Sequence, residues 1–498
     1  MENPTFLFPK NSTIPLPDFA DVVIIGSGLG SLSAAALLAK AGKKVLVLEQ
    51  NYLPGGCTSS YLRQGAVFES GATTLVGLDG DMPLAFLLRQ TGIEIPAEQM
   101  PLPMRVMLKD GEWINRYPTL PEWIREAERV FGKAGQKAFW EECFRLSEWV
   151  WNVSTRQLHF PPDSWKDVWP MLKNTRLKDV GFAPYAFMTT EALLKKHGLN
   201  NNKRFVDFVN EQLMITAQNH LEEVNALFGA TALCYTLKGN YYVPGGMIRL
   251  IKPIVDFIES HGGKLQLKAS VEGISKKGNQ WEVRFNAGII HCQTIVSGIP
   301  LHNLQEMLST DGLNARIQKQ LRSVDQLNSA LQMGILFRSE QSFDCLHHQL
   351  HLPEEHQRAF GKSIFISISK QNDRLRAAEG CYVASVSTHV RLGKQVKDDR
   401  IAYQEAVLDV LEKEGFLRRE DILYQHVSGV NSWLQWTKRA FGFVGGFPQV
   451  KSIAPWKMPS ARLGNGIYIC GDSVYPGQGI PGVVLSGIIA AEKLLADH

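Results

Sequence analysis

Residues 21–50 read DVVIIGSGLGSLSAAALLAKAGKKVLVLEQ, and this stretch gives the strongest indication of the fold. Its first five residues form an apolar run that predicts a buried parallel strand, and residues 30–41 are rich in Ala and Leu, which predicts a helix ending at Gly42. Residues 45–48 predict a second buried strand. The stretch therefore predicts a βαβ unit with glycines in its first turn, an arrangement that binds dinucleotides.

The glycine turn has the spacing of a dinucleotide-binding fingerprint. Gly26 permits the tight turn, and Gly28 lets the backbone approach a pyrophosphate at the helix N-terminus. The third glycine position of the fingerprint holds Ser31, which is small enough for close packing of the helix on the strand. Glu49 follows Gly26 by 23 residues, near the spacing of about 20 expected for an acid that binds ribose. The residues of this unit that we assign to the cofactor are Gly26, Ser27, Gly28, Gly30, Ser31, Glu49 and Gln50.

The bulk composition limits the class of protein. A chain of 498 residues is too long for one core, so we expect two or more domains, with segments that interleave along the chain. The net charge of +4, without a dense run of Lys and Arg, argues against nucleic acid as a partner. The seven cysteines are scattered with no CxxC pair, as expected for reduced thiols of a cytoplasmic protein. The sequence shows no signal peptide and no apolar run of about 18 residues, which predicts a soluble protein or one on a membrane surface.

Two further glycine-rich segments indicate a binding site. After Glu49 the chain continues through Pro54-Gly55-Gly56, whose glycines would let the backbone fold over a pyrophosphate. Residues 467–495 read IYICGDSVYPGQGIPGVVLSGIIAAEKLL, in which an apolar strand precedes Asp472, a Pro-Gly-Gln-Gly loop and a predicted helix over 482–495. A carboxylate directly after a buried strand must be hydrogen-bonded or solvated, so Asp472 is a candidate ligand-binding residue.

These three segments, together with VPGGMIRLIKPIVDFIESHGGKLQLKASVEGI (residues 243–274), resemble the FAD-dependent phytoene desaturase and carotenoid isomerase superfamily. That superfamily also includes retinol saturases and, more distantly, amine oxidases. The resemblance implies an α/β fold, with a Rossmann-like FAD-binding domain and an interleaved α+β substrate domain, as in flavin amine oxidases and phytoene desaturases. The implied FAD-binding domain comprises residues 1–80, 243–300 and 455–498, and the implied substrate-binding domain comprises residues 81–242 and 301–454.

The resemblance also implies roles for individual residues. The backbone of Val271 would meet the adenine of FAD, Asp472 would accept hydrogen bonds from the ribityl hydroxyls, and Gly477-Gln478-Gly479 would pass the isoalloxazine ring. The N-terminus of the last helix would direct a positive dipole end at the flavin, which favours hydride acceptance. Many phytoene desaturases carry Arg after the Pro-Gly-Gly, whereas this chain has Cys57, a feature closer to retinol saturases. The residues outside the βαβ unit that we assign to the cofactor are Gly55, Gly56, Cys57, Thr58, Val271, Gly471, Asp472, Gly479 and Ile480.

The remaining chain predicts scaffold and a hydrophobic substrate region. Seven of the 11 tryptophans lie between residues 113 and 169, and residues 205–235 are mainly apolar and amide side chains, as in a helix-rich substrate domain. His347, His348 and His351 have i, i+1, i+4 spacing in a loop-like stretch, which favours a solvated surface over a metal site. The sequence shows no Ser/His/Asp set and identifies no catalytic base. Further predicted elements are helices 247–261 and 399–414 and strands 264–268, 294–297, 364–369 and 381–387.

A flavin site without an evident acid–base set suits an apolar substrate that is oxidised by hydride loss. We therefore expect an FAD-dependent carotenoid desaturase that introduces a double bond into an acyclic end, and the resemblance favours 3′,4′-desaturation of a monocyclic carotenoid. The Pro-Gly-Gln-Gly loop also resembles carotenoid cis–trans isomerases, and Cys57 resembles retinol saturases, so both chemistries stay open. GDP dissociation inhibitors share this architecture as prenyl-binding chaperones, but intact flavin motifs at both ends argue against them. A soluble amine oxidase is a further alternative.

One segment bears on membrane contact. Residues 159–188, HFPPDSWKDVWPMLKNTRLKDVGFAPYAFM, interleave Trp, Leu and Phe with Lys166, Lys173, Arg176 and Lys178. Such a mixture is typical of a segment at a bilayer interface, where a carotenoid would be collected. A packed helix pair with a basic exposed face has the same composition. Peripheral membrane association is therefore one of two interpretations that the sequence leaves open.

Overall fold

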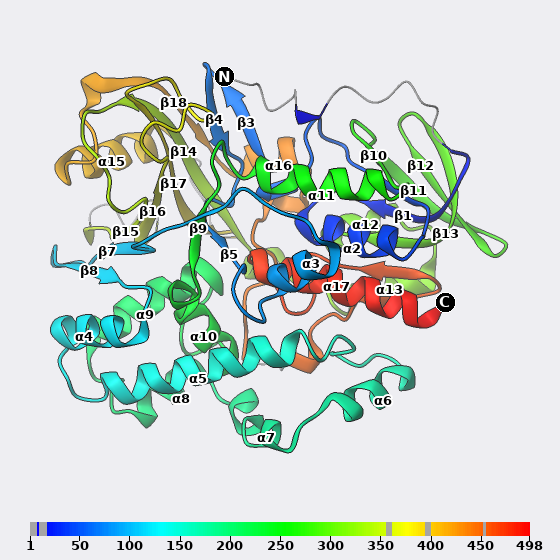
Figure 1. The fold of residues 1–498 in the computed structure, drawn as a ribbon, viewed down its shortest axis with the longest axis horizontal. Helices are drawn as coiled ribbons and strands as arrows, with labels where there is room; N and C mark the ends of the chain where they lie inside the picture. Colours follow the sequence, from blue (N-terminus) through cyan, green and yellow to red (C-terminus); the bar gives the residue numbers. More distant parts are fainter. Residues whose placement is uncertain (1–6, 9–16, 355–360, 394–399, 452–454) are drawn as a thin grey trace.

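Two large β-sheets organise the molecule (Figure 1). The computed structural model describes residues 7–8, 17–354, 361–393, 400–451 and 455–498. The first sheet has eight strands in the order β10-β2-β1-β13-β12-β11, with β20 beside β13 and β19 beside β20. Its strands are β1 Phe19–Ile25, β2 Val45–Leu48, β10 Lys264–Gln266, β11 Val271–Lys277, β12 Gln280–Phe285, β13 Gly288–Ser297, β19 Arg462–Gly464 and β20 Ile467–Ile469.

The predicted βαβ unit is confirmed. β1 and β2 run parallel, with Val22 opposite Val45, and α2 Leu29–Lys40 connects them, beginning one residue before its predicted start. On the other side of β1 lies β13, which is also parallel to it. β13 is longer than the predicted strand over 294–297 because its first residues pair with β12 in an antiparallel hairpin.

Four helices share one apolar core with the parallel strands: α2, α3 Pro83–Thr91, α11 Ile248–Ser260 and α17 Ile480–Asp497. In Figure 1 the red α17 lies beside the blue α2. A Cβ on Gly487 of α17 would come within 2.1 Å of the carbonyl oxygen of Gly30 in α2, so only glycine permits this approach. The close packing of α17 on α2 places the start of the last helix beside the glycine turn.

The second sheet has seven strands in the order β18-β14-β17-β16-β15-β7-β8. Its neighbours are antiparallel except for the parallel pair β15 and β7, and α15 Arg400–Lys413 packs on it. β16 and β17 confirm the strands predicted over 364–369 and 381–387, and Asp399, the first residue of the predicted helix, lies outside the described residues. The strands are β7 Met104–Met107, β8 Trp113–Arg116, β14 Asn328–Arg338, β15 His347–His351, β16 Ser363–Ile368, β17 Cys381–Arg391 and β18 Ile422–Ser428.

A helical layer completes the molecule and confirms the helices expected between residues 205 and 235. It buries an aromatic core in which Trp123 and Trp140 meet edge to face, with ring centroids 4.9 Å apart. Its helices are α4 Leu120–Phe131, α5 Gln136–Ser154, α6 Trp165–Asn174, α7 Leu177–Val180, α8 Thr190–Lys196, α9 Lys203–Thr216 and α10 Ala226–Leu233. The smaller elements are β3 Ser60–Arg63, β4 Ala66–Glu69, β5 Leu75–Val76, β6 Glu98–Gln99, β9 Asn240–Tyr242, α12 Leu301–Met307, α13 Asp311–Gln318 and α16 Val430–Thr437.

The strands of the first sheet come from three separate parts of the chain, 19–48, 264–297 and 462–469, and those of the second from 104–116 and 328–428. The domain boundaries given above stay a prediction. Within the described ranges, no helix is both long enough and apolar enough to cross a membrane. The seven cysteines are all free thiols.

The expectation that His347, His348 and His351 lie on a solvated surface is wrong. They belong to β15, which lies between β16 and β7, and all three side chains are buried. Burial lowers the pKa values of the three imidazoles to about 4, 3 and 4, respectively. In the part of the chain that the structure describes, no group of His, Cys, Asp and Glu side chains could hold a metal ion.

The buried histidines predict an acid-sensitive fold. The pKa of His348 is about 3 in the folded chain against about 6.5 in the unfolded chain. Its contribution to the free energy of unfolding is therefore present above about pH 6.5 and is lost as the pH falls towards 3. Between pH 6 and pH 4 this loss amounts to about 2–3 kcal/mol. His348→Leu should therefore flatten the pH dependence of urea unfolding in that window. An unchanged slope between pH 6 and pH 4 would contradict the assignment.

Candidate functional site

The glycine turn after β1 is held by the acid that ends the next strand. Glu49 accepts hydrogen bonds from the backbone nitrogen of Ser27 (2.9 Å), from Ser27 Oγ (2.6 Å) and from the backbone nitrogen of Asn51 (2.8 Å). Gly26 has a φ of 84°, in the region that favours glycine. The carboxylate therefore fixes the turn against the carboxyl end of β2, where the sequence predicted a ribose.

The Pro54-Gly55-Gly56 turn lies directly on the glycine turn. The backbone nitrogen of Gly55 donates a 3.0 Å hydrogen bond to the carbonyl of Ser27, and Gly28 and Gly55 form an isolated parallel bridge. A Cβ on Gly56 would lie 3.4 Å from the Cα of Gly28. Thr58 continues this turn through a 2.9 Å bond from its backbone nitrogen to the carbonyl of Gly55. The two predicted pyrophosphate segments therefore form one wall.

Gly28 and Gly30 differ in a way that indicates a ligand. A Cβ on Gly30 would come within 2.8 Å of the Val483 carbonyl oxygen, so packing of α17 requires that glycine. A Cβ on Gly28 would meet no described atom within 4 Å, and its φ of −59° is open to any residue. The N-terminus of α2 has no side-chain cap and no acidic residue in its first turn. Free backbone N–H groups beside a small residue suit the diphosphate of a dinucleotide.

The C-terminal segment adjoins the same turn. Gly471 has a φ of 100°, and its backbone nitrogen donates a 2.8 Å hydrogen bond to Ser486 Oγ in α17. A Cβ on Gly298 would come within 1.8 Å of Ser31 Oγ, so Ser31, at the third fingerprint position, packs directly against Gly298. Gly479, with a φ of 81°, is the N-cap of α17, and Ile480 is its first residue. The helix thus begins two residues before the predicted start, and its N-terminus faces the predicted flavin loop.

Asp472 has a partner that the sequence did not reveal. Arg439 Nη2 donates to both carboxylate oxygens of Asp472, at 3.0 and 2.8 Å, and Arg439 Nε donates to the carbonyl of Phe443 at 2.7 Å. Burial acts to lower the pKa of Arg439, but Asp472 and Cys57 together raise this pKa above the ordinary value. Asp472 is therefore an ion-paired carboxylate whose outer lone pairs can accept hydroxyl donors.

The predicted adenine and ribose residues lie together at the other end of this site. The backbone nitrogens of Lys268 and Ala269 donate to the carbonyls of Asn51 and Glu49, at 3.0 and 2.8 Å. These bonds bring the buried Val271, at the start of β11, close to the end of β2. Gln50 Nε2 donates a 3.1 Å hydrogen bond to the carbonyl of Thr437. The structure thus brings every residue assigned to the cofactor to the carboxyl edge of the parallel strands or to the loops around it.

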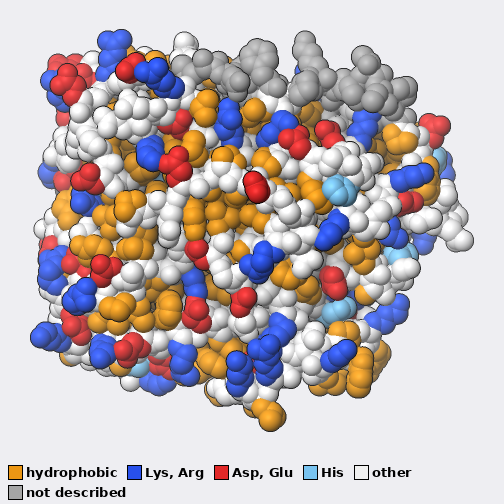
Figure 2. All heavy atoms as spheres, in the orientation of Figure 1, with side chains coloured by type: hydrophobic (Ala, Val, Ile, Leu, Met, Phe, Trp, Pro, Cys, Tyr) orange, Lys and Arg blue, Asp and Glu red, His pale blue; other side chains and the backbone are white. Residues whose placement is uncertain are grey.

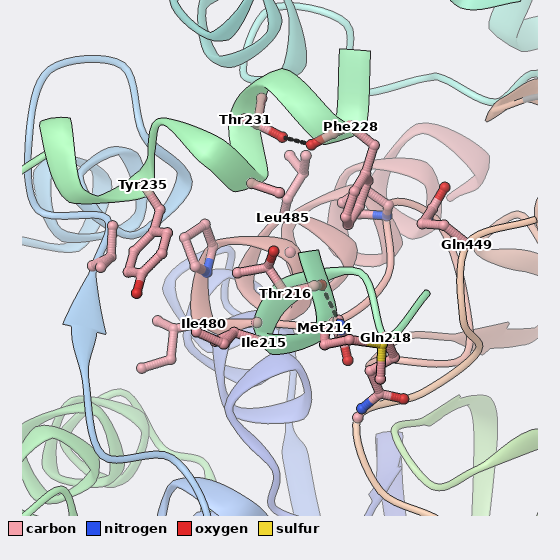
Figure 3. A pocket seen from close by; sticks show the side chains of 18 of the residues that line it. Met214, Ile215, Thr216, Gln218, Phe228, Thr231, Tyr235, Gln449, Ile480 and Leu485 are labelled. Carbon is pink, nitrogen blue, oxygen red and sulfur yellow. Dashed lines mark hydrogen bonds between the residues drawn. The ribbon is translucent and has the colours of Figure 1, made fainter. Parts of the chain in front are cut away.

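A cavity of about 820 Å³ opens beside the predicted flavin loop. Its volume lies towards the upper end of the range of about 300–1,000 Å³ for small-molecule sites. In Figure 3, side chains from α9, α10 and the start of α17 converge on it, including Ile215, Phe228 and Leu485. Cys57, Gln478 and Gly479 line it on the side of the cofactor residues. The Gln478 side chain donates to the carbonyl of Thr216, which ties the flavin loop to α9.

Among the residues that the structure describes, two carboxyl groups line this cavity. Asp179 accepts hydrogen bonds from Arg156 and from Trp149, so its carboxylate is already paired. Glu211 accepts a 2.6 Å hydrogen bond from Ser363 Oγ, and burial raises its pKa above the usual range despite that bond. A buried carboxyl with a raised pKa on a cavity wall is a candidate for proton transfer. The sequence offered no signal for Glu211, because it lies on an ordinary amphipathic helix.

Comparisons with known proteins identify the family of this chain. A family model of flavin-containing amine oxidoreductases matches residues 32–495. Prolycopene isomerase of Daucus carota is 24% identical, with 96% of this chain and 80% of that protein covered. All-trans-retinol 13,14-reductase of Homo sapiens is 27% identical over 68% of this chain and 56% of that protein. A solved putrescine oxidase variant has a TM-score of 0.62 at 15% identity, covering 96% of this chain and 100% of that chain.

These matches confirm the α/β fold with its FAD-binding architecture, FAD as the cofactor, and an FAD-dependent oxidoreductase as the kind of enzyme. They also confirm the superfamily that the glycine motifs resemble, in its broad form. The family match extends from within α2 to near the end of the chain, and it includes the Pro54-Gly55-Gly56 turn and the C-terminal glycine segment. The chain belongs to the family of flavin-containing amine oxidoreductases.

Proposed function

We propose that the protein is an FAD-dependent carotenoid desaturase, which introduces a double bond into an acyclic end of its substrate. The observation that carries the proposal is the large, mainly apolar cavity that shares Gly479 and Gln478 with the predicted flavin loop. An apolar cavity of this size excludes water and suits a long hydrocarbon better than a small charged amine. The relatives named for prolycopene and retinol support a hydrophobic polyene. The narrower proposal is 3′,4′-desaturation of a monocyclic carotenoid.

The proposed reaction uses the cavity wall as follows. Bound FAD supplies a hydride acceptor. That acceptor would take a hydride from one carbon of the polyene, and oxygen or a quinone would be the final electron acceptor. Glu211 would take a proton from the neighbouring carbon, so that the electrons of this second C–H bond would form the new double bond. The raised pKa of Glu211 makes its carboxylate a stronger base than an exposed carboxylate, which suits proton abstraction in a dry cavity.

A single-turnover experiment tests this proposal. Anaerobic mixing of the FAD-loaded protein with lycopene in liposomes should bleach the visible absorbance of the flavin. Glu211→Gln keeps the side-chain volume and a hydrogen bond to Ser363, so it should leave FAD content unchanged and slow the bleaching by about 100- to 10,000-fold. Full-rate bleaching by this variant would exclude Glu211 as the proton acceptor. An unbleached wild-type flavin would argue against desaturation of this substrate.

A second candidate is carotenoid cis–trans isomerisation. It is favoured by one observation, the similarity to prolycopene isomerase of Daucus carota across 96% of this chain. An isomerase needs the same cavity and cofactor site but produces no net change in the flavin. A retinol-saturase-like reduction is supported less, because that relative matches only 68% of the chain. The family match and the enzyme relatives support both alternatives over a prenyl-binding chaperone without flavin.

We also propose that the protein docks on a cytoplasmic membrane surface through α6 and α7, which lie at the lower edge of Figure 1. Trp165, Trp169 and Leu172 share one face of α6 at i, i+4, i+7 spacing and are 89%, 74% and 64% exposed. Basic side chains accompany them, and Figure 2 shows orange and blue side chains together at this edge. Met171 of α6 also lines the cavity, so a docked protein could take up a polyene directly.

Vesicle binding tests the docking surface. Trp165→Ser/Trp169→Ser should weaken co-sedimentation with phosphatidylcholine–phosphatidylglycerol vesicles by about tenfold or more, because two interfacial aromatic anchors are lost. The control is Ile401→Ser, which removes a side chain that is 77% exposed on α15, the helix that packs on the second sheet. Equal binding by the double variant and the control would contradict the docking surface.

A further inference from the structure

The loop between α16 and the short 3₁₀ helix Ala440–Gly442 runs along the cofactor site. At one end, the carbonyl of Thr437 accepts a hydrogen bond from Gln50, which directly follows Glu49, the predicted ribose-binding acid. At the other end, Arg439 contacts Asp472, the predicted ribityl partner. In FAD the diphosphate joins the ribose to the ribityl chain. Thr437 and Arg439 therefore lie beside the position that the diphosphate must take, whereas the side chain of Lys438 between them is exposed.

Contacts within the protein hold the guanidinium of Arg439 in place without a ligand. It lies 4.6 Å from the centroid of the Phe443 ring, and its side chain is only 11% exposed. Its hydrogen bonds to Phe443 and Asp472 use Nε and Nη2. No described residue accepts a hydrogen bond from Nη1. A rigid guanidinium with a free edge is suited to a phosphate oxygen.

The charge of Arg439 also reaches the Pro54-Gly55-Gly56 turn. Burial raises the pKa of the Cys57 thiol, and Arg439 is the strongest electrostatic influence that opposes this rise. Cys57 directly follows the two glycines that lie on Gly28. Neither glycine segment, residues 26–31 or residues 54–59, contains a Lys or an Arg. The α2 N-terminus supplies only about half a positive charge against the two charges of a diphosphate.

We propose that the guanidinium of Arg439 binds the FAD diphosphate. It would supply the positive charge that the Gly55-Gly56-Cys57 turn lacks. Asp472 then has two roles, because it accepts hydrogen bonds from the ribityl chain and also orients the guanidinium. The proposal concerns the cofactor alone and does not depend on which polyene reaction the protein catalyses.

Binding of ADP and adenosine to the FAD-depleted full chain, measured by calorimetry, tests the proposal. ADP carries the diphosphate and adenosine does not, so Arg439→Met should weaken ADP and FAD by about 10- to 100-fold and leave adenosine unchanged. Lys438→Met is the matched control, since it removes an exposed neighbouring cation and should change ADP affinity by about twofold or less. Wild-type affinity of Arg439→Met for ADP would overturn the proposal.

A second pair of variants guards against misfolding, because Arg439→Met leaves Asp472 without its cation. Asp472→Asn keeps Arg439 and should keep ADP affinity. Arg439→Met/Asp472→Asn leaves neither charge unpaired and should lose ADP affinity as the single variant does. If Arg439→Met/Asp472→Asn binds ADP as tightly as Asp472→Asn does, the guanidinium does not contact the diphosphate. Arg439 then acts only by orienting Asp472, and the proposal fails. Restoration of ADP binding by Cys57→Arg in the Arg439→Met background would support it independently.

Discussion

Gly28→Val is expected to remove FAD from the protein while leaving the unliganded chain as stable as the wild type. A Cβ at this position meets no described atom within 4 Å, and the backbone conformation is open to valine. The same side chain would occupy the space beside the N-terminus of α2 where we place the diphosphate. An overpacking cost of about 3 kcal/mol corresponds to a loss of FAD affinity of roughly 100-fold. Flavin content after purification and thermal unfolding of the apoprotein measure the two effects separately.

Gly30→Val is the matched control for this prediction. Its Cβ would meet the Val483 carbonyl oxygen at 2.8 Å and the Gly471 nitrogen at 3.2 Å. It should therefore lower the melting temperature of the apoprotein itself, because α17 must move away from α2. If Gly28→Val kept its full complement of FAD, the diphosphate would lie elsewhere and the assignment of the glycine turn would be wrong.

Asp472→Ala is expected to have the largest combined effect on stability and on cofactor binding. The substitution leaves the buried guanidinium of Arg439 without its carboxylate, a loss that costs about 3–5 kcal/mol. It also removes the acceptor for the ribityl hydroxyls. Urea unfolding of the apoprotein should show the first effect, and FAD content should show the second.

The conservative Asp472→Asn distinguishes the two contributions. Its amide oxygen still accepts a hydrogen bond from Arg439, so it should recover part of the lost stability. Full FAD content and full activity in Asp472→Ala would mean that the C-terminal segment does not bind the flavin.

The sequence alone predicted the parts of the site whose residues lie close together along the chain. The glycine turn, Glu49 and the two flanking strands lie within 30 residues, and each has a fixed spacing with a physical reason. Arg439 could not be found in this way. It lies 33 residues before Asp472 in a stretch without a recognisable spacing, and only the folded chain brings the two together. A pairing of this kind depends on tertiary packing and leaves no periodic signal in the sequence.

The histidines of β15 show why a polar pattern can mislead. Three imidazoles in five residues suggest exposure, yet a strand between two neighbours can be covered on both faces. Burial disfavours the charged form of each imidazole and lowers its pKa, so the side chains are buried as neutral groups. The substrate cavity was equally hidden. Its wall combines Glu211 and Ile215, which share one face of α9, with side chains from β-strands and from α17.

The reaction proposed for this FAD site is desaturation of a carotenoid. The most direct measurement is mass and absorption analysis of the pigments in a host that accumulates lycopene or γ-carotene, with and without this chain. Desaturation would give a product that has lost two hydrogens for each new double bond and absorbs at longer wavelength. Gly28→Val, which should lack FAD, is expected to abolish this product. An unchanged mass with altered cis bands would replace desaturation with isomerisation. Unchanged pigments in the presence of the FAD-loaded protein would contradict the proposed substrate.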